Sequence, residues 1–118
     1  MSKTILVIDD EKKMLEFYQT VLSGFGQVRT ALNLSEARAQ LAGVDLIILD
    51  FVLEQDQELI QEIIPELKRV APVLLCSGLQ EPGVPAIGDQ LGVDGYWNKG
   101  TDHEQLRALV GSVLAKQG

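Results

Sequence analysis

The stretch T-I-L-V-I-D-D-E-K-K-M, residues 4–14, places a short apolar run directly before three acids. The run, residues 5–8, is too short for a stand-alone helix and is apolar on both faces, as expected of a strand covered on both sides of a sheet. The carboxyl groups of Asp9, Asp10 and Glu11 repel one another at this spacing unless water or a cation lies between them. The stretch therefore predicts a buried strand that ends in a solvated or cation-binding acidic group.

Two further runs, residues 46–49 and 73–76, are apolar on both faces in the same way. Residues 27–30 alternate instead, which is typical of a half-exposed edge strand, and residues 95–98 predict a fifth strand. Strands alternating with helices predict one α/β domain over residues 1–118, a doubly wound parallel sheet with helices on both faces. The intervals between the strands show helical apolar periodicity in four segments: residues 14–22, 34–41, 60–67 and 106–114.

Local signals predict where several helices begin. Asn33 is the expected N-cap of the second helix, with Glu36 three residues later. Thr101 and Glu104 show the same capping pattern before the last helix. Pro65 lies inside the third helical segment, which predicts a kink or a late start.

The chain of 118 residues carries a formal net charge of −7 and has a sequence pI near 4.5. This charge argues against a nucleic-acid surface, which normally shows a basic patch, and against binding to anionic membranes. No apolar run approaches the roughly 18 residues that a membrane helix needs. Cys76 is the only cysteine, so an intrachain disulfide is excluded and a small buried side chain is expected. These features predict a cytoplasmic protein.

Polar residues stand where four of the predicted strands end. They are Asp9 and Asp10 after the first, Asp50 after the third, Ser77 after the fourth and Lys99 after the fifth. Because the carboxyl ends of parallel strands meet at one edge of the sheet, these side chains should converge. Clustered carboxylates suit Mg²⁺, a hard cation that prefers oxygen ligands. A hydroxyl beside an ammonium suits the oxygens of a phosphoryl group.

Each of these residues also has an ordinary structural interpretation. Asp10 or Glu11 could cap the next helix, Ser77 could form a turn, and the other charges could be solvated at the surface. Turn chemistry gives no reason for a lysine after one strand and an aspartate after another. The joint occurrence therefore favours a functional site.

At these motifs the chain resembles the receiver domain of bacterial response regulators. The resemblance covers essentially the whole chain, residues 1–118, and implies a flavodoxin-like (βα)5 fold with strand order 2-1-3-4-5. It rests on four motifs in order: V-I-D-D-E (7–11), L-I-I-L-D (46–50), V-L-L-C-S-G (73–78) and L-G-V-D-G-Y-W-N-K-G (91–100).

The resemblance implies a metal-assisted phosphoacceptor. Asp50 would be the nucleophile that takes a phosphoryl group from a histidine kinase or a phosphotransfer protein and becomes an acyl phosphate. Mg²⁺ would be bound directly by Asp10 and Asp50, through water by Asp9, and by the backbone carbonyl of Val52.

The resemblance also implies groups that respond to the phosphoryl group. Lys99 would pair with one phosphoryl oxygen, and Ser77 would move to hydrogen-bond another. Tyr96 stands at the position of the family's switch aromatic and would swing inward as Ser77 moves. An aromatic ring packed on the outer strand face is the open alternative for Tyr96. Trp97 faces the other way by strand alternation and is expected in the core.

A signalling module is implied, not an enzyme that turns over a separate substrate. It would catalyse only its own phosphorylation and dephosphorylation and would change its contacts with a downstream protein target, as a monomer or weak homodimer. Binding to nucleic acid or membranes is not expected. Two alternatives stay open: a degenerate receiver that binds partners without phosphorylation, and an aspartate-nucleophile phosphohydrolase. The second typically needs a carboxylate where this chain has Val52.

Three features depart from the family pattern: Gly100, the irregular segment 82–91, and the loop of residues 51–58, which lacks the family's typical proline and glycine. Gly100 follows the lysine where the family usually has proline with a cis bond, and a trans bond is expected at this position because a cis bond before a non-proline costs about 2.5–4 kcal/mol. The prolines and glycines of residues 82–91 oppose a stable helix, so one short helix is expected there. Val52 and Leu79 are apolar and cannot orient an attacking water, which predicts slow self-dephosphorylation.

Overall fold

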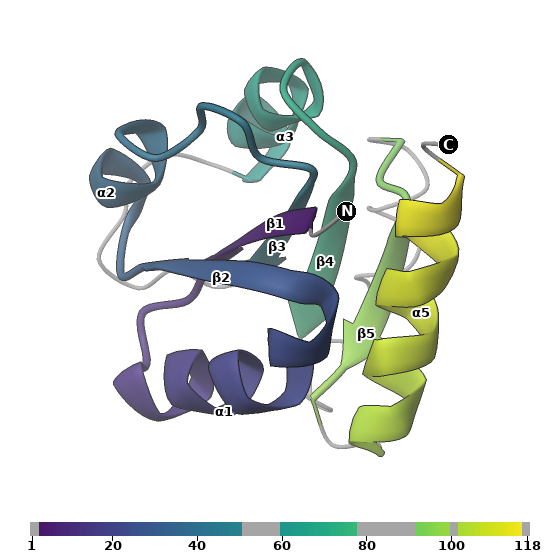
Figure 1. Cartoon of the computed structure of the whole chain (residues 1–118). Helices are drawn as coiled ribbons and strands as arrows, with labels where there is room; N and C mark the ends of the chain where they lie inside the picture. Colours follow the sequence, from purple (N-terminus) through teal and green to yellow (C-terminus); the bar gives the residue numbers. More distant parts are fainter. Residues whose placement is uncertain (1–2, 51–59, 78–91, 100–101, 117–118) are drawn as a thin grey trace.

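The computed structural model describes residues 3–50, 60–77, 92–99 and 102–116 (Figure 1). Five parallel strands form one sheet in the order β2-β1-β3-β4-β5, which confirms the predicted flavodoxin-like arrangement. The edge position of β2 agrees with its alternating sequence. The strands are β1 (Lys3–Ile8), β2 (Gly26–Ala31), β3 (Leu46–Asp50), β4 (Val73–Ser77) and β5 (Gly95–Asn98).

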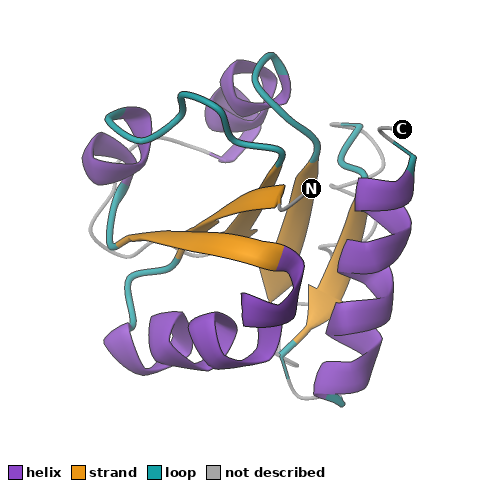
Figure 2. Ribbon diagram, in the orientation of Figure 1, coloured by secondary structure: helices purple, strands orange, loops and turns teal. Residues whose placement is uncertain are grey.

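Helices cover both faces of the sheet. Figure 2 shows α2 and α3 on one side and α1 and α5 on the other, and the buried side chains form one core on each side. Among the described residues, no helix is long and apolar enough to cross a membrane. The helices are α1 (Lys12–Leu22), α2 (Leu34–Arg38), α3 (Ile60–Lys68) and α5 (His103–Ala115), with a 3₁₀ turn, Ser23–Phe25, between α1 and β2.

The apolar runs are explained by this two-sided burial. Along β1, Leu6 and Ile8 face the α2–α3 side, whereas Ile5 and Val7 face the α1–α5 side, and all four are fully buried. Successive side chains of a strand point to opposite faces, so a strand with a helix layer on each face must be apolar at every position. Cys76 is likewise buried, on the α1–α5 side, as expected.

The predicted start of α2 is confirmed, but its predicted length is wrong. Asn33 Oδ1 accepts a hydrogen bond from the Glu36 N–H at 2.9 Å, which is the expected N-cap. The helix ends at Arg38, although the apolar pattern continues to Leu41. Leu41 still packs against the core, from the segment after the helix, so its apolar side chain is partly buried without a further helical turn.

The structure also bears on the predicted starts of α5 and α3. The N-cap of α5 is Asp102 and not Thr101, because the Asp102 carboxylate accepts a hydrogen bond from the Glu104 N–H at 3.0 Å. A negative charge is also favourable at a helix N-terminus. The α3 helix contains Pro65, next to the buried Ile64, so it does not start after the proline; the kink that was the other expectation stays a prediction. Thr101 lies outside the described residues.

The sequence Gly-Val-Asp occurs twice, directly before β3 and directly before β5. Both glycines have positive φ, 76° and 74°, a conformation that favours glycine. The Asp45 carboxylate accepts a hydrogen bond from the Thr4 N–H at 2.8 Å, and the Asp94 carboxylate accepts one from the Val73 N–H at 2.9 Å. Each aspartate N–H donates to the carbonyl of the same partner. Equivalent clamps therefore fasten β3 to β1 and β5 to β4 at their amino ends.

Candidate functional site

Three side chains from three strands meet at the carboxyl ends of the sheet. Asp9 follows β1, Asp50 ends β3 and Lys99 follows β5. Lys99 Nζ lies 3.0 Å from Asp9 Oδ2 and 2.9 Å from Asp50 Oδ1. Both aspartates are buried, with exposed fractions of 0% for Asp9 and 6% for Asp50. The structure therefore brings together residues that lie as many as 90 positions apart in the sequence.

Backbone hydrogen bonds fix the places of these residues. The Asp9 N–H donates to the Ala31 carbonyl of β2 at 3.1 Å, and Asp9 Oδ1 accepts from the Glu11 N–H at 3.0 Å. The Lys99 N–H donates to the Ser77 carbonyl at 2.8 Å. Ser77 ends β4 and is itself buried, so the predicted hydroxyl stands on the strand next to the lysine.

Burial and charge shift the proton equilibria of this group. Burial raises the pKa of Asp50 to about 6, and the charge of Asp9 adds to this, while Lys99 opposes it. Burial alone would lower the pKa of Lys99, but its contacts with Asp50 and Asp9 outweigh that effect and raise the pKa. The lysine is therefore charged at neutral pH, and the greater part of Asp50 is ionised.

The three consecutive acids after β1 form a candidate cation-binding group. Asp9, Asp10 and Glu11 each offer a carboxylate oxygen, and these oxygens lie within 4.8 Å of one another. An oxygen-only donor set at this spacing fits a hard cation such as Mg²⁺. Glu11 is the N-cap of α1 by position, yet within the described residues its side chain makes no capping hydrogen bond. The sequence placed Glu11 in this acidic group and left a capping role open for it; the structure shows the grouping of the three carboxylates and no side-chain cap by Glu11.

The two aromatic residues of β5 differ in exposure. Tyr96 is 39% exposed, whereas Trp97 is 4% exposed and packs in the α1–α5 core, as predicted for Trp97. The switching role of Tyr96 stays a prediction. The remaining site predictions, the Val52 carbonyl and the influence of Leu79, lie outside the described residues, as do the helix expected at 82–91 and the peptide bond before Gly100.

Comparison with known proteins places this arrangement in a family. The sequence profile of the response regulator receiver domain matches residues 5–111. The chain belongs to the response regulator receiver family. Receiver domains are the signalling modules of two-component response regulators and are not classical enzymes. The predicted family and fold are thereby confirmed.

Two curated relatives are transcriptional regulators of twice this length. The receiver is 31% identical to the alkaline phosphatase synthesis transcriptional regulatory protein PhoP of Bacillus subtilis, over 98% of this chain and 50% of PhoP. It is 28% identical to the transcriptional regulatory protein GltR of Pseudomonas aeruginosa, over 97% of this chain and 50% of GltR. The chain thus spans about half the length of the curated relatives it matches.

Solved structures agree on the fold. The response regulator DrrB of Thermotoga maritima superposes with a TM-score of 0.85 and 26% identity, covering 99% of this chain and 54% of DrrB. A receiver domain protein of Clostridium thermocellum gives a TM-score of 0.83 at 21% identity, covering 98% of this chain and 96% of that protein. The second likeness shows the fold alone.

Proposed function

We propose that this receiver is a phosphoacceptor that takes a phosphoryl group on Asp50 in a Mg²⁺-dependent reaction. The observation that carries the proposal is the contact of a buried carboxylate, Asp50, with the ammonium of Lys99 at 2.9 Å. A buried acid held beside a side-chain cation is suited to phosphoryl transfer chemistry in a way that a solvated surface acid is not.

The chemistry needs a nucleophile and compensation for developing charge. An Asp50 carboxylate oxygen attacks the phosphorus atom, a new O–P bond forms, and the bond from phosphorus to the donor breaks with its electron pair leaving on the donor. Lys99 then pairs with a phosphoryl oxygen instead of the free carboxylate, and the Ser77 hydroxyl supplies a further hydrogen-bond donor. The product is an acyl phosphate on Asp50.

The acidic group would hold the cation. Asp10, Asp50 and the carbonyl of Val52 are the proposed direct Mg²⁺ ligands, and Asp9 would bind the ion through water. Glu11 lies close enough to Asp9 and Asp10 to add to their negative field. When bound, Mg²⁺ would neutralise charge on the transferring phosphoryl oxygens. The repulsion among these carboxylates gives the chain a reason to bind a divalent cation at this edge of the sheet.

The direct test is intact mass measurement after incubation with Mg²⁺ and a small acyl phosphate. One added phosphoryl group is expected on the wild-type chain, and none on Asp50→Asn or in the presence of EDTA. Glu62→Gln removes an exposed carboxylate of α3 and serves as the matched control, with phosphorylation expected to be unchanged. Phosphoryl addition that persists in Asp50→Asn would move the acceptor elsewhere. No addition to the wild type under any of these conditions would favour the degenerate receiver that acts without phosphorylation.

The partners follow from this proposal. The natural donor would be a histidine kinase or phosphotransfer protein in the cytoplasm, and the phosphorylated form would change its contacts with a downstream protein, as a monomer or weak homodimer. The net charge of −7 gives the domain no excess of positive charge with which to bind nucleic acid itself. The lifetime of the acyl phosphate should be long, as Val52 and Leu79 predict, and its decay can be followed by the same mass measurement.

A further inference from the structure

The Lys99 ammonium lies within reach of two carboxylates, although the residue that follows Lys99 does little to restrict the backbone. The next residue is Gly100, the residue type with the greatest backbone freedom. On the β4 side, the Lys99 N–H is fixed to the Ser77 carbonyl at 2.8 Å. A contact from the α5 side would add a second restraint, on the side of Lys99 that faces away from β5.

Trp97 supplies a rigid anchor two residues before the lysine. Its ring is 4% exposed and stacks on Phe17 of α1, with centroids 5.8 Å apart and an interplanar angle of 11°. Tyr18 contacts it edge-on, with a centroid distance of 6.2 Å. These two ring contacts favour one orientation of the indole, and so one direction of its N–H.

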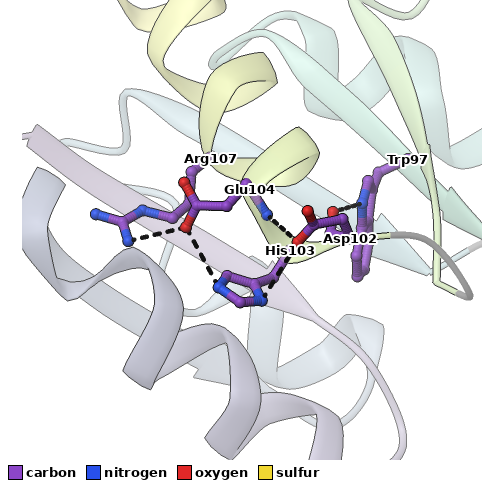
Figure 3. Close-up of polar contacts among 5 residues, drawn as sticks. All are labelled: Trp97, Asp102, His103, Glu104 and Arg107. Carbon is purple, nitrogen blue, oxygen red and sulfur yellow. Dashed lines mark hydrogen bonds and ion pairs between the residues drawn. The ribbon is translucent and has the colours of Figure 1, made fainter.

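That N–H reaches the start of α5. Trp97 Nε1 donates to the Asp102 carbonyl at 3.4 Å, which is long for this type of bond, and Figure 3 shows the contact beside the first turn of the helix. The Asp102 carboxylate at the same time caps the Glu104 N–H at 3.0 Å. Asp102 therefore connects β5 to the N-terminus of α5, and Lys99 lies between the two joined residues.

We propose, on the basis of the phosphoacceptor function above, that Trp97 is a positioning residue for Lys99. Its indole N–H closes the segment from residue 97 to residue 102 and so keeps the Lys99 ammonium within reach of Asp9 and Asp50. Trp97 itself lies on the core side of β5 and contacts no reacting atom. Gly100 stands after the lysine where the family usually has a proline. In this chain the hydrogen bond from Trp97 to Asp102 would restrain the backbone around Lys99 instead.

The first test removes the indole N–H and keeps an aromatic ring. Trp97→Phe should lower the rate of phosphorylation by a small acyl phosphate roughly fivefold, the effect of one hydrogen bond of about 1 kcal/mol. In a Lys99→Ala background the same substitution should change the rate less than about twofold, because the group that it positions is gone. An equal loss in both backgrounds would mean a purely structural role and would overturn the proposal.

The second test does not depend on phosphorylation. Lysine amines are labelled with a limiting amount of an amine-reactive reagent, and the modification of Lys99 is compared with that of the exposed Lys116 by peptide mass spectrometry. In Trp97→Phe, Lys99 should be labelled roughly fivefold faster relative to Lys116, because its ammonium leaves the carboxylates more often. Unchanged relative labelling would overturn the proposal even if the wild type proved to accept no phosphoryl group.

A matched control separates positioning from loss of stability. Val110→Ala truncates a buried α5 residue of the same core and leaves the Trp97 indole and its N–H in place, and should destabilise the domain by an amount similar to Trp97→Phe or greater. Its relative labelling of Lys99 should equal that of the wild type. Faster labelling in this control as well would show that any loosening of α5 frees the lysine, and would count against a specific role for the indole.

Discussion

At the amino ends of β3 and β5, Asp45 and Asp94 accept hydrogen bonds from backbone N–H groups of the neighbouring strand, whereas at the carboxyl ends Asp9 and Asp50 share the ammonium of Lys99. A backbone N–H in a paired strand cannot leave without breaking the sheet. A lysine side chain can turn to a different oxygen. The same residue type is therefore structural at one edge of the sheet and available for chemistry at the other.

The two edges should also differ in what their acids do to stability. Asp45 and Asp94 satisfy polar groups that would otherwise be left without a partner, so they stabilise the fold. Asp50 is buried with a pKa raised to about 6, so its ionised form is less favourable in the folded chain than in the unfolded one. Loss of the carboxylate acceptor should therefore destabilise the domain at the amino edge, whereas loss of the buried charge should stabilise it at the carboxyl edge.

The largest effect is expected for Asp50→Asn in the metal-free protein. Because the pKa of Asp50 is raised from 3.8 to about 6, the folded state holds this proton more tightly than the unfolded state, and stability falls as the pH rises through that window. One pKa unit corresponds to about 1.4 kcal/mol, so Asp50→Asn should be more stable than the wild type by roughly 2–3 kcal/mol at pH 7.5. Urea denaturation with EDTA measures this. The gain should vanish below about pH 4, and a gain that is independent of pH would show that the buried charge is not its cause.

The next effect tests the opposite edge. Asp94→Ala leaves the buried Val73 N–H without its side-chain acceptor and should cost about 2 kcal/mol of unfolding free energy. Asp94→Asn keeps an acceptor and loses only the charge toward Lys68, whose contact with Asp94 is partly exposed, so it should cost less than about 1 kcal/mol. Equal losses in the two variants would assign the stabilisation to the ion pair and not to the clamp. Phosphorylation should proceed at the wild-type rate in both.

The contrast between the edges explains which features the sequence predicts well. Apolar runs mark β1, β3 and β4 because burial on both faces leaves no polar position, and residues at strand ends converge because parallel strands share one direction. The clamps of Asp45 and Asp94 could not be predicted from the sequence, because Gly-Val-Asp before a strand resembles an ordinary loop. Only the strand register shows which backbone N–H donates to each aspartate. The bond from Trp97 to Asp102 is hidden for the same reason, since its acceptor is a backbone carbonyl that any residue type would offer.

The errors in the predicted helix ends also arise because tertiary packing cannot be read from local sequence. Thr101 and Asp102 are both good capping residues one position apart, and the choice between them depends on where α5 packs. Leu41 keeps the helical spacing of α2 and packs against the core, but it lies beyond the end of the helix. The prediction named the wrong capping residue for α5 and the wrong end for α2, because packing decides where each helix begins and ends.

A smaller effect is expected in the core beneath the carboxyl edge. The Tyr18 hydroxyl is buried with no nitrogen or oxygen partner among the described residues, and the Cys76 thiol, a weak hydrogen-bonding group, lies beside it. Tyr18→Phe removes this buried hydroxyl and should raise the unfolding free energy by about 1 kcal/mol. Thermal denaturation checks the sign. A loss of stability would mean that the contact with Cys76 compensates the hydroxyl, and Cys76→Ala should then remove the difference between Tyr18 and Phe.

The smallest effect concerns an acid that belongs to neither edge. Glu66 of α3 pairs with Arg38 of α2 through two contacts of 2.8 and 2.9 Å, and both side chains are 39% exposed. The hydrogen bonds from Arg38 lower the pKa of Glu66, so the stabilisation is present at neutral pH and is lost as the pH falls through that lowered pKa. Solvent screening limits it, and Arg38→Gln should cost only about 0.5 kcal/mol at pH 7 and low salt. The cost should shrink in about 1 M salt, because exposed charges are screened there, whereas the cost of Asp94→Ala should not. A salt-independent loss for Arg38→Gln would show that the guanidinium acts by packing α2 against α3. Glu66 would then have a structural role, as Asp45 and Asp94 have at the amino edge.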